Sequence, residues 1–200
     1  MGATPTAADW ACWLNGGASC KIVNQSNVVL STGNVAGMYT LLQAVRGTGA
    51  QNVVMMGGLA YSSLFQSWVS SVTSITAVST ANVAASWHIY DFNNTGCPSQ
   101  YNNNTSVNDC YSTTQLTSSS VTDISSVLAA GFPVVAGETG AAESVNYPWW
   151  TNMFSYFTSQ NIGFLGWAWT TDSGEDLITN YSTGTASPEG AILQSYLGKF

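Results

Sequence analysis

Apolar residues follow one another along this chain in two distinct patterns. Where they recur every three or four positions they predict helices, and where they form short uninterrupted runs they predict buried strands of a parallel sheet. Four such runs occur, at 52–57 (NVVMMG), 83–90 (VAASWHIY), 134–137 (VVAG) and 164–169 (FLGWAW). We therefore expect four strands at these places.

Helical periodicity occupies the segments around the strands. It predicts helices over 35–46, 62–72 and 117–130, a fourth from Pro148 through Phe157, and a last one that begins at Pro188 and includes Tyr196. One helix is thus followed by four strand–helix units without a break in composition, which is typical of an α/β fold with a parallel sheet. Four units make either half of a (β/α)8 barrel or a short open sheet, and periodicity favours neither.

The composition argues against some classes of binding partner for this chain and favours others. The chain has 200 residues, of which 45% are hydrophobic and only 6% are charged, and its formal net charge is −7. Lys21, Arg46 and Lys199 cannot form the basic surface that a phosphate backbone requires, so we do not expect nucleic acid as a partner. No apolar run is long enough to span a membrane. Eight Trp and nine Tyr supply rings that suit stacking against sugars, although most are expected in the core.

The four cysteines form two local pairs. Cys12 and Cys20 bracket the stretch WLNGGAS, and Cys97 and Cys110 bracket the Asn-rich stretch PSQYNNNTSVND. We expect both stretches to be loops, each closed by a disulfide. Neither spacing matches a zinc module, and the sequence points to neither a metal nor an organic cofactor. Two disulfides together with the low charge predict an extracellular, secreted protein.

Working residues in parallel α/β barrels lie at the carboxyl ends of the strands, and this rule selects a short set of candidates. They are Tyr61 beyond the first strand, His88, Tyr90 and Asp91 at the second, Glu138 at the third, and Trp167 and Trp169 at the fourth. Glu138 lies between Gly137 and Gly140, which would let a substrate approach the backbone. A Tyr or His hydrogen bond can keep such a carboxylate ionised, although His88 alone is equally well explained as a core histidine.

Three motifs at the strand ends, HIY at 88–90, GETG at 137–140 and GWAWTTDSG at 166–174, resemble those of glycoside hydrolase family 5, the cellulase family. The resemblance covers nearly the whole chain from about Asp9, where DWACWLNGG is similar to the stretch after the fourth strand of that family. It implies the C-terminal half of a (β/α)8 barrel, taken from a retaining hydrolase with two catalytic glutamates.

The resemblance also implies a role for individual residues. Glu138 corresponds to the nucleophile at the end of the seventh strand of the family, and His88 and Tyr90 correspond to the active-site pair after the sixth strand. Trp167 or Trp169 corresponds to the sugar-stacking Trp of the eighth strand. These residues would therefore act on a β-linked polysaccharide or oligosaccharide in the manner of an endo-β-1,4-glucanase.

Two more candidates and the domain boundaries follow from the same resemblance. The segment GGLAYSS (57–63) lies where the fifth strand of the family ends, so we expect Tyr61 to be a cleft aromatic, with Asp91 as a further substrate contact. Residues 1–200 would form a single half-barrel domain. In it, residues 1–34 are an N-terminal disulfide loop and lead-in, and residues 35–200 hold the first helix and the four β/α units.

The sequence departs from the family pattern in one respect. The acid/base glutamate of the family lies in an Asn-Glu-Pro motif at the end of the fourth strand, and this sequence contains no Asn-Glu-Pro. Retaining hydrolysis needs two carboxyl groups about 5–5.5 Å apart. Five acidic residues on loops of the same rim are candidate substitutes, although most loop acids are merely solvated: Asp91, Glu143, Asp172, Glu175 and Asp176.

A half-barrel has two apolar edge strands, and such edges invite pairing with another chain. We expect a twofold homodimer in which the last strand of each copy pairs with the first strand of the other, closing eight strands. The two copies of Glu138 would then face each other across one mouth. Three functions stay open: a hydrolase of β-linked polysaccharide, a carbohydrate-binding remnant without turnover, and a truncated or engineered half-barrel fragment.

Overall fold

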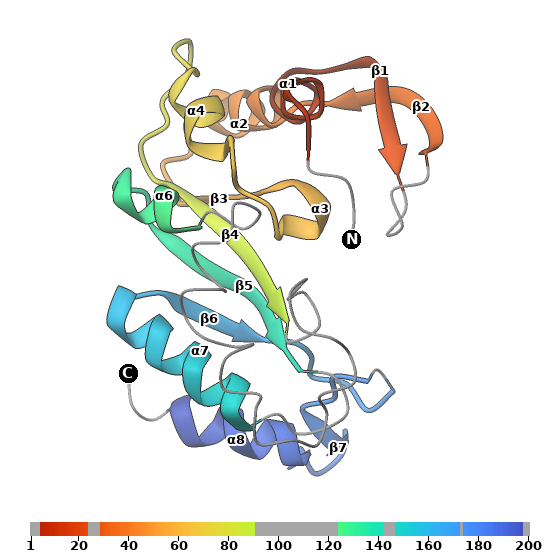
Figure 1. Cartoon of the computed structure of the whole chain (residues 1–200), viewed down its shortest axis with the longest axis vertical. Coiled ribbons are helices and arrows are strands. Elements are labelled where there is room, and N and C mark those ends of the chain that lie inside the picture. Colours follow the sequence, from red (N-terminus) through yellow and green to blue (C-terminus); the bar gives the residue numbers. More distant parts are fainter. Residues whose placement is uncertain (1–4, 24–28, 91–123, 142–146, 173, 198–200) are drawn as a thin grey trace. The chain divides into compact units, whose positions relative to one another are not determined.

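A computed structural model describes residues 5–23, 29–90, 124–141, 147–172 and 174–197 (Figure 1). In chain order the elements are α1 (Ala7–Asn15), β1 (Gly16–Val23), β2 (Val29–Ala36), α2 (Met38–Gly47), β3 (Val54–Gly57), α3 (Leu59–Ser62), α4 (Trp68–Thr73), β4 (Val83–Tyr90), α6 (Ile124–Ala129), β5 (Val134–Gly140), α7 (Tyr147–Gln160), β6 (Gly163–Gly166), β7 (Ile178–Asn180), β8 (Thr185–Ala186) and α8 (Pro188–Leu197). All four predicted strands are present.

The four predicted strands form one sheet in the order β3-β4-β5-β6 (Figure 1). The described registers of β3 with β4 and of β5 with β6 are parallel, which confirms the predicted α/β fold with a parallel sheet. β6 ends at Gly166, before the predicted end at Trp169. The chain turns to a new partner there, because the N–H of Ala168 donates to Glu175 and its carbonyl accepts from Leu177.

β4 is buried along almost its whole length, and only His88 is partly exposed. The strand has neighbours on both edges, and the Trp87 side chain packs edge-on against Tyr156 and Phe157 of α7. A strand covered on both faces reads in sequence as a continuous apolar run. This explains why the predicted bounds of 83–90 agree with the observed ones.

The chain folds as two compact units. The first comprises Met1–Ser86 with Ser120–Val134, and the second comprises Trp87–Ser119 with Val135–Phe200. In the first unit, the indole N–H groups of Trp13 and Trp68 donate to the carbonyls of Gly57 and Met56 at 3.0 and 3.1 Å, which attaches α1 and α4 to β3.

The segment expected to be an N-terminal disulfide loop is instead regular structure. Thr6 and Asp9 form a capping box at the start of α1, in which each side chain accepts a hydrogen bond from the backbone of the other. The disulfide between Cys12 and Cys20 is present and joins α1 to β1. The stretch WLNGGAS therefore holds the end of a helix and the start of a strand, and the spacing of Thr6 and Asp9 was the local signal for that helix.

The helix predicted over 62–72 is shorter than expected. Ala60, Tyr61 and Ser62 have positive φ angles of 48°, 56° and 63°, and the regular helix α4 begins only at Trp68. Left-handed backbone costs about 1–2 kcal/mol per non-glycine residue, and it persists where the surrounding structure determines it. Hydrophobic periodicity carries no information about such a turn, so the prediction failed there.

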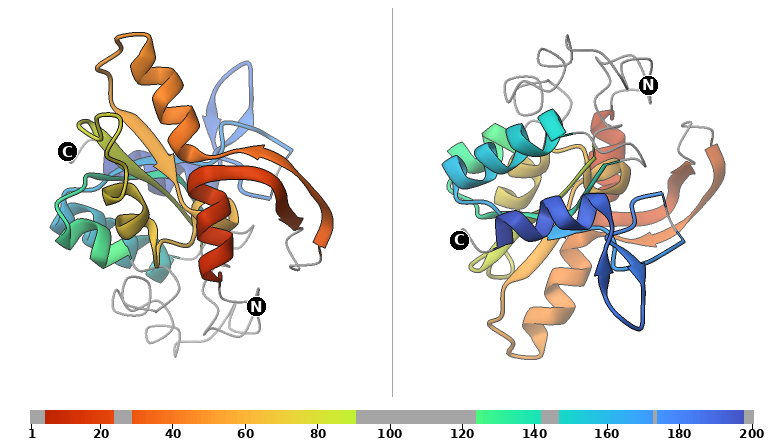
Figure 2. Two further views of the ribbon diagram at one scale, coloured as in Figure 1. Left: turned by 90° about the horizontal axis from the view of Figure 1, so that it is seen from above. Right: turned by 90° about the horizontal axis from the view of Figure 1, so that it is seen from below.

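Aromatic packing around α7 forms the core of the second unit. Phe154 stacks on Tyr196 of α8 with ring centres 4.0 Å apart, and it packs against Phe164 of β6 at 4.9 Å. Trp149, Trp150 and Phe157 are fully buried in the same unit. α7 and α8 therefore lie side by side, as the view from below shows (Figure 2).

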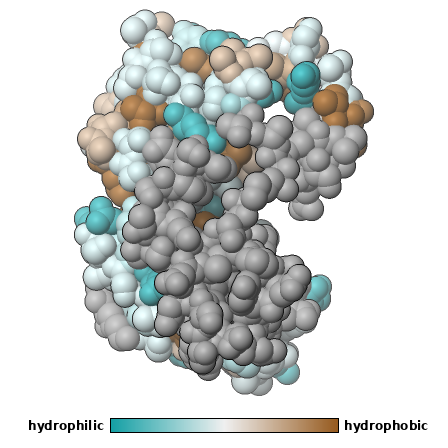
Figure 3. Space-filling model, in the orientation of Figure 1, coloured by the Kyte–Doolittle hydropathy of each residue, from teal (hydrophilic) through white to brown (hydrophobic). Residues whose placement is uncertain are grey.

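The described surface carries few charges. On the face in view, most of it is white or pale teal, with small and separate brown groups (Figure 3). Such a surface is expected of a chain with 6% charged residues, because Ser, Thr, Asn and Gly must cover the core instead. Within the described ranges, no helix is both long enough and apolar enough to cross a bilayer.

Candidate active site

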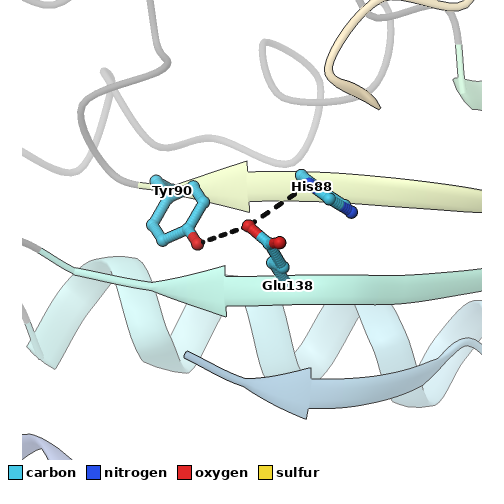
Figure 4. A network of polar contacts seen from close by, with 3 residues as sticks. All are labelled: His88, Tyr90 and Glu138. Atoms are coloured by element: carbon cyan, nitrogen blue, oxygen red, sulfur yellow. Dashed lines mark hydrogen bonds and ion pairs between the residues drawn. The ribbon is translucent and has the colours of Figure 1, made fainter. Parts of the chain in front are cut away.

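Three polar side chains meet at the carboxyl ends of β4 and β5. The hydroxyl of Tyr90 donates to Oε2 of Glu138 at 2.8 Å, and Nδ1 of His88 lies 3.2 Å from the same oxygen. Figure 4 shows that Tyr90 and His88 both reach Glu138 from the neighbouring strand. Neither contact engages Oε1, the other carboxylate oxygen.

Strand geometry explains this convergence. Side chains two residues apart point to the same face of a strand, so His88 and Tyr90 share one face of β4 while the intervening Ile89 points to the other. β5 is the neighbour of β4 in the sheet and carries Glu138 near its carboxyl end. The structure therefore brings together the three residues that the sequence marked as catalytic candidates.

Gly140 has a different role from the expected one. A Cβ atom at this position would lie 3.0 Å from the ring of Tyr90 and 2.9 Å from the carbonyl oxygen of Trp167. The space beside Gly140 is thus filled by Tyr90 and is not open to a substrate. The missing side chain allows the Tyr90 ring to lie close to β5, from where its hydroxyl reaches Glu138.

Burial changes the pKa of both partners of Glu138. It lowers the pKa of His88, and the Glu138 charge opposes this only in part, so the imidazole is neutral near pH 7. Burial also raises the pKa of Tyr90 well above its ordinary value, and the hydrogen bond to Glu138 adds to this. Tyr90 therefore keeps its proton and remains a donor to Glu138 at any physiological pH.

The two candidate sugar-stacking residues differ from the other tryptophans. Six of the eight Trp are buried, whereas the side chains of Trp167 and Trp169 are 44% and 66% exposed. The N–H of Trp167 donates to Thr139, the residue after Glu138, at 2.9 Å. Trp169 lies farther along the loop, with its ring near Gly184. The structure thus places Trp167 directly beside the strand that carries Glu138.

The remaining candidates are distributed more widely. Tyr61 belongs to the first unit, where its side chain is 66% exposed. Asp91, Glu143, Cys97 and Cys110 lie outside the described residues.

The described rim acids differ in their surroundings. Asp172 is exposed and accepts a hydrogen bond from Thr170, and Asp176 and Glu175 are partly buried. The charge of Glu175 also raises the pKa of Tyr90.

Sequence reasoning missed one acidic residue at this site. Glu189, in the first turn of α8, is 7% exposed and accepts a hydrogen bond from the N–H of Ala141 at 2.7 Å. Its charge also raises the pKa of Tyr90. The motif Ser187-Pro188-Glu189 marked a helix start, but nothing local showed that the carboxylate turns inward. Within the described ranges, no group of three His, Cys, Asp or Glu residues could hold a metal ion.

Comparison with known families identifies the family of the chain. The family model described as Cellulase (glycosyl hydrolase family 5) matches residues 8–173. The chain belongs to glycosyl hydrolase family 5. A comparison with curated proteins found no match.

Solved structures of similar fold include an endo-β-1,4-glucanase of Xanthomonas axonopodis pv. citri, which is 22% identical with a TM-score of 0.58. The match covers 81% of this chain and 54% of the glucanase chain. A β-glucanase of Saccharophagus degradans, in complex with cellotetraose, is 13% identical with a TM-score of 0.57, covering 80% and 45%. A β-mannanase of Streptomyces thermolilacinus, with mannohexaose, is 19% identical with a TM-score of 0.53, covering 78% and 46%.

These matches settle the choice that periodicity left open. The chain spans about half the length of the solved structures that it matches. Its four parallel strands and their helices are therefore half of a (β/α)8 barrel and not a short open sheet.

Proposed function

We propose that this chain carries the nucleophile side of a retaining β-glycosidase site, with Glu138 as the nucleophile. The observation that supports this most strongly is the pair of contacts to Oε2, from the Tyr90 hydroxyl at 2.8 Å and from His88 Nδ1 at 3.2 Å. A phenol that keeps its proton remains a hydrogen-bond donor and orients the carboxylate. Oε1 is then available to attack a sugar.

The proposed reaction has two displacement steps. In the first, an oxygen of Glu138 bonds to the anomeric carbon, the bond to the leaving oxygen breaks, and an acid gives its proton to that oxygen. In the second, water bonds to the anomeric carbon and gives a proton to the same group, now a base, while Glu138 leaves as a carboxylate. Tyr90 and His88 hold the carboxylate and exchange no proton with the substrate.

The proposed substrate is a β-linked polysaccharide or oligosaccharide of the glucan or mannan type. The exposed indole of Trp167, beside β5, offers a flat face for a pyranose ring. The glucanase and mannanase structures of similar fold support the same class. Trp169, Tyr61 and Asp91 are further proposed contacts. Secretion also stays a proposal, which the Cys12–Cys20 disulfide supports.

A second carboxyl group must act as acid and then as base. Two other carboxylates act on Tyr90, and of these Glu189 is buried, whereas Glu175 is partly exposed and is our candidate within one copy. Glu175→Gln should slow the first step, departure of the leaving group, for glycosides with poor leaving groups and spare it for those with good ones, because a good leaving group needs no proton. The second step should slow for both substrates, because it has lost its base. An equal loss in the first step on both substrates would indicate a sugar contact instead.

We also propose that two copies of the chain close the barrel. The outer strands β3 and β6 each have one edge that pairs with no described strand. Large apolar side chains are exposed there: Val53 and Met55 at β3 are 63% and 44% exposed, and Leu165 on β6 is 57% exposed. Pairing β6 of one copy with β3 of the other would cover both edges. Analytical ultracentrifugation should show a dimer, and a 21.1 kDa monomer at micromolar concentration would contradict it.

The nucleophile can be tested without the acid. 2,4-Dinitrophenyl β-cellobioside has a leaving group that needs no protonation, so Glu138 should release one dinitrophenolate per chain and retain a cellobiosyl group. Mass spectrometry of peptides should locate this group on Glu138. Azide, which needs no base, should then release it faster than water. Labelling at any other residue, or equal labelling of Glu138→Gln, would refute the assignment.

The absence of Asn-Glu-Pro favours a second candidate function, sugar binding without turnover. In that case cellopentaose should bind, as measured by calorimetry, and no labelling of Glu138 should occur. Trp167→Ala should abolish the binding, and Trp68→Phe, a change at a fully buried Trp, serves as the matched control.

A further inference from the structure

Glu189 is a buried carboxylate that the proposed chemistry does not use. It lies in the first turn of α8 and is 7% exposed. A buried charge persists where hydrogen bonds and local dipoles replace the lost water. The amino end of α8 provides a favourable dipole, and the N–H of Ala141 donates to Oε1 at 2.7 Å. The position of Ala141 indicates what this bond does.

Ala141 directly follows β5, the strand of Glu138, and is itself buried. Glu189 supplies the acceptor for its N–H at the point where the strand has ended. The bond therefore fixes the backbone on the carboxyl side of Glu138. It also fixes the neighbouring Gly140, against which the ring of Tyr90 lies.

The helix that carries Glu189 is itself attached to the segment between β6 and β7. The N–H of Ser187 donates to Leu177 at 3.0 Å, and the Ser187 hydroxyl accepts from the N–H of Gly190 at 2.9 Å. A Cβ atom on Gly190 would lie 1.9 Å from the carbonyl oxygen of Leu177, so glycine is required for this close approach. The first turn of α8 thus rests on the segment at Leu177.

These bonds form a closed ring around the ends of β5 and β6. Leu177 donates to Ala168 at 3.0 Å, and the adjacent Trp167 donates to Thr139 of β5 at 2.9 Å. The bond from Ala141 to Glu189 then closes the ring. On β5, Glu138 directly precedes Thr139 and accepts a hydrogen bond from Tyr90. Gly140, between Thr139 and Ala141, lies beside the aromatic ring of Tyr90.

We propose that Glu189 is a positioning residue, whose carboxylate holds the end of β5 so that Oε2 of Glu138 stays within reach of Tyr90 and His88. The catalytic consequence rests on the proposed role of Glu138 as nucleophile. The positioning itself can be measured without any turnover.

The single histidine of the sequence is a suitable reporter. The pKa of His88 is lowered by burial and raised by the charge of Glu138. If Glu138 moves away from His88, the second effect weakens and the pKa of His88 falls. NMR titration of the imidazole resonances therefore measures whether Glu138 is in place, and Glu138→Gln gives the value expected when its charge is lost.

Two substitutions at Glu189 distinguish the effect of its side-chain length from the effect of its charge. Glu189→Asp keeps the charge but is one methylene shorter, so it should lose the bond to Ala141 and move the His88 pKa most of the way to the Glu138→Gln value. Glu189→Gln keeps the length and an acceptor oxygen, so its His88 pKa should remain that of the native chain. An unchanged pKa in Glu189→Asp, or an equal fall in both variants, would overturn the proposal.

A second substitution tests the same proposal if Glu189→Asp does not fold. Ser187→Ala removes the hydroxyl that accepts from Gly190 and loosens the same turn of α8 while leaving Glu189 intact. It should lower the His88 pKa in the same direction, and an unchanged value in the folded variant would count against the proposal.

Labelling by 2,4-dinitrophenyl β-cellobioside distinguishes the positioning role of Glu189 from the proposed hydrolase function. If the His88 pattern holds but no variant is labelled, the positioning role stands and the hydrolase function fails. If Glu138 is labelled at equal rates in the native chain, Glu189→Asp and Glu189→Gln, and the His88 pKa is the same in all three, the positioning role fails alone.

Discussion

Charged side chains at the two ends of the parallel strands are held in opposite ways. At the amino ends of β3 and β4, Arg46 donates only to backbone carbonyls, at distances of 2.8 to 3.5 Å: those of Ala50, Asn52, Ala81 and Asn82. At the carboxyl ends of β4 and β5, Glu138 is contacted by the side chains of Tyr90 and His88.

The difference separates a residue that serves stability from one that we propose serves chemistry. A guanidinium bound to four carbonyls fixes where two strands begin. A carboxylate held through one oxygen keeps the other oxygen uncommitted. Active sites of parallel barrels lie at the carboxyl ends of the strands, whereas the amino ends serve stability. Substitutions at the two ends should therefore affect different properties.

The largest expected effect is on chemistry at the carboxyl end. Glu138→Gln removes the proposed attacking oxygen and should reduce release of dinitrophenolate on the order of 10⁴-fold, since the proposed reaction depends on this nucleophile. The free energy of unfolding should change little, because the side chain is partly exposed. Stopped-flow absorbance and urea denaturation measure the two quantities, and a large loss of stability would contradict the comparison.

The next effect is on stability at the amino end. Arg46→Ala removes four hydrogen bonds from a charged donor and should lower the free energy of unfolding by about 2–3 kcal/mol, measured in urea. Arg46→Lys is the matched control and should recover only part of this, because an ammonium lacks the planar fork of donors. Labelling of Glu138 per folded molecule should be unchanged, and a selective loss of labelling would refute the division of roles.

A smaller effect is expected from the phenol that holds the carboxylate. Tyr90→Phe removes one hydrogen bond to a charged group and should slow labelling of Glu138 about 10- to 100-fold, equivalent to about 1.4–2.7 kcal/mol. Tyr156→Phe, a change at another buried phenol of the same unit, is the control and should have no such effect. Equal rates in Tyr90→Phe and the native chain would show that Oε2 needs no donor.

The smallest expected effect is a pH dependence of stability. The pKa of His88 is lower in the folded chain than its ordinary value of 6.5, so the unfolded chain takes up this proton first. The effect of His88 on the free energy of unfolding is therefore absent above pH 6.5, and acidification below that pH should destabilise the fold. Urea denaturation at pH 7.5 and 5.5 should show a smaller decrease for His88→Asn than for the native chain, and equal decreases would contradict the shift.

Much of the fold follows from local pattern. The bounds of β4 and the start of α8 agree with the sequence predictions, because a continuous apolar run and a Pro at a helix start are local signals. His88, Tyr90 and Glu138 then follow from the rule that working residues of parallel barrels lie at the carboxyl ends of the strands. By contrast, the strands of the pairs β1–β2 and β7–β8 contain no long continuous apolar run, and hydrophobic periodicity passed over them.

Other features depend on contacts between residues far apart in the chain. Ala141 and Glu189 are separated by 48 positions, so no local pattern could reveal their hydrogen bond. Gly140 was expected to make room for a substrate, yet the ring of Tyr90 occupies that room. The left-handed turn at Tyr61 likewise has no signature in hydrophobic spacing.

The sequence by itself determined which segments are buried, which strands are parallel and which residues stand at the strand ends, because burial and period are written in consecutive residues. Only the tertiary structure decided which oxygen of Glu138 is held, what fills the space at Gly140 and where Glu189 is bonded. Those outcomes depend on the packing of neighbouring strands and on how α8 is attached to them. Distances of a few ångströms between remote residues fix them, and no stretch of sequence encodes such distances alone.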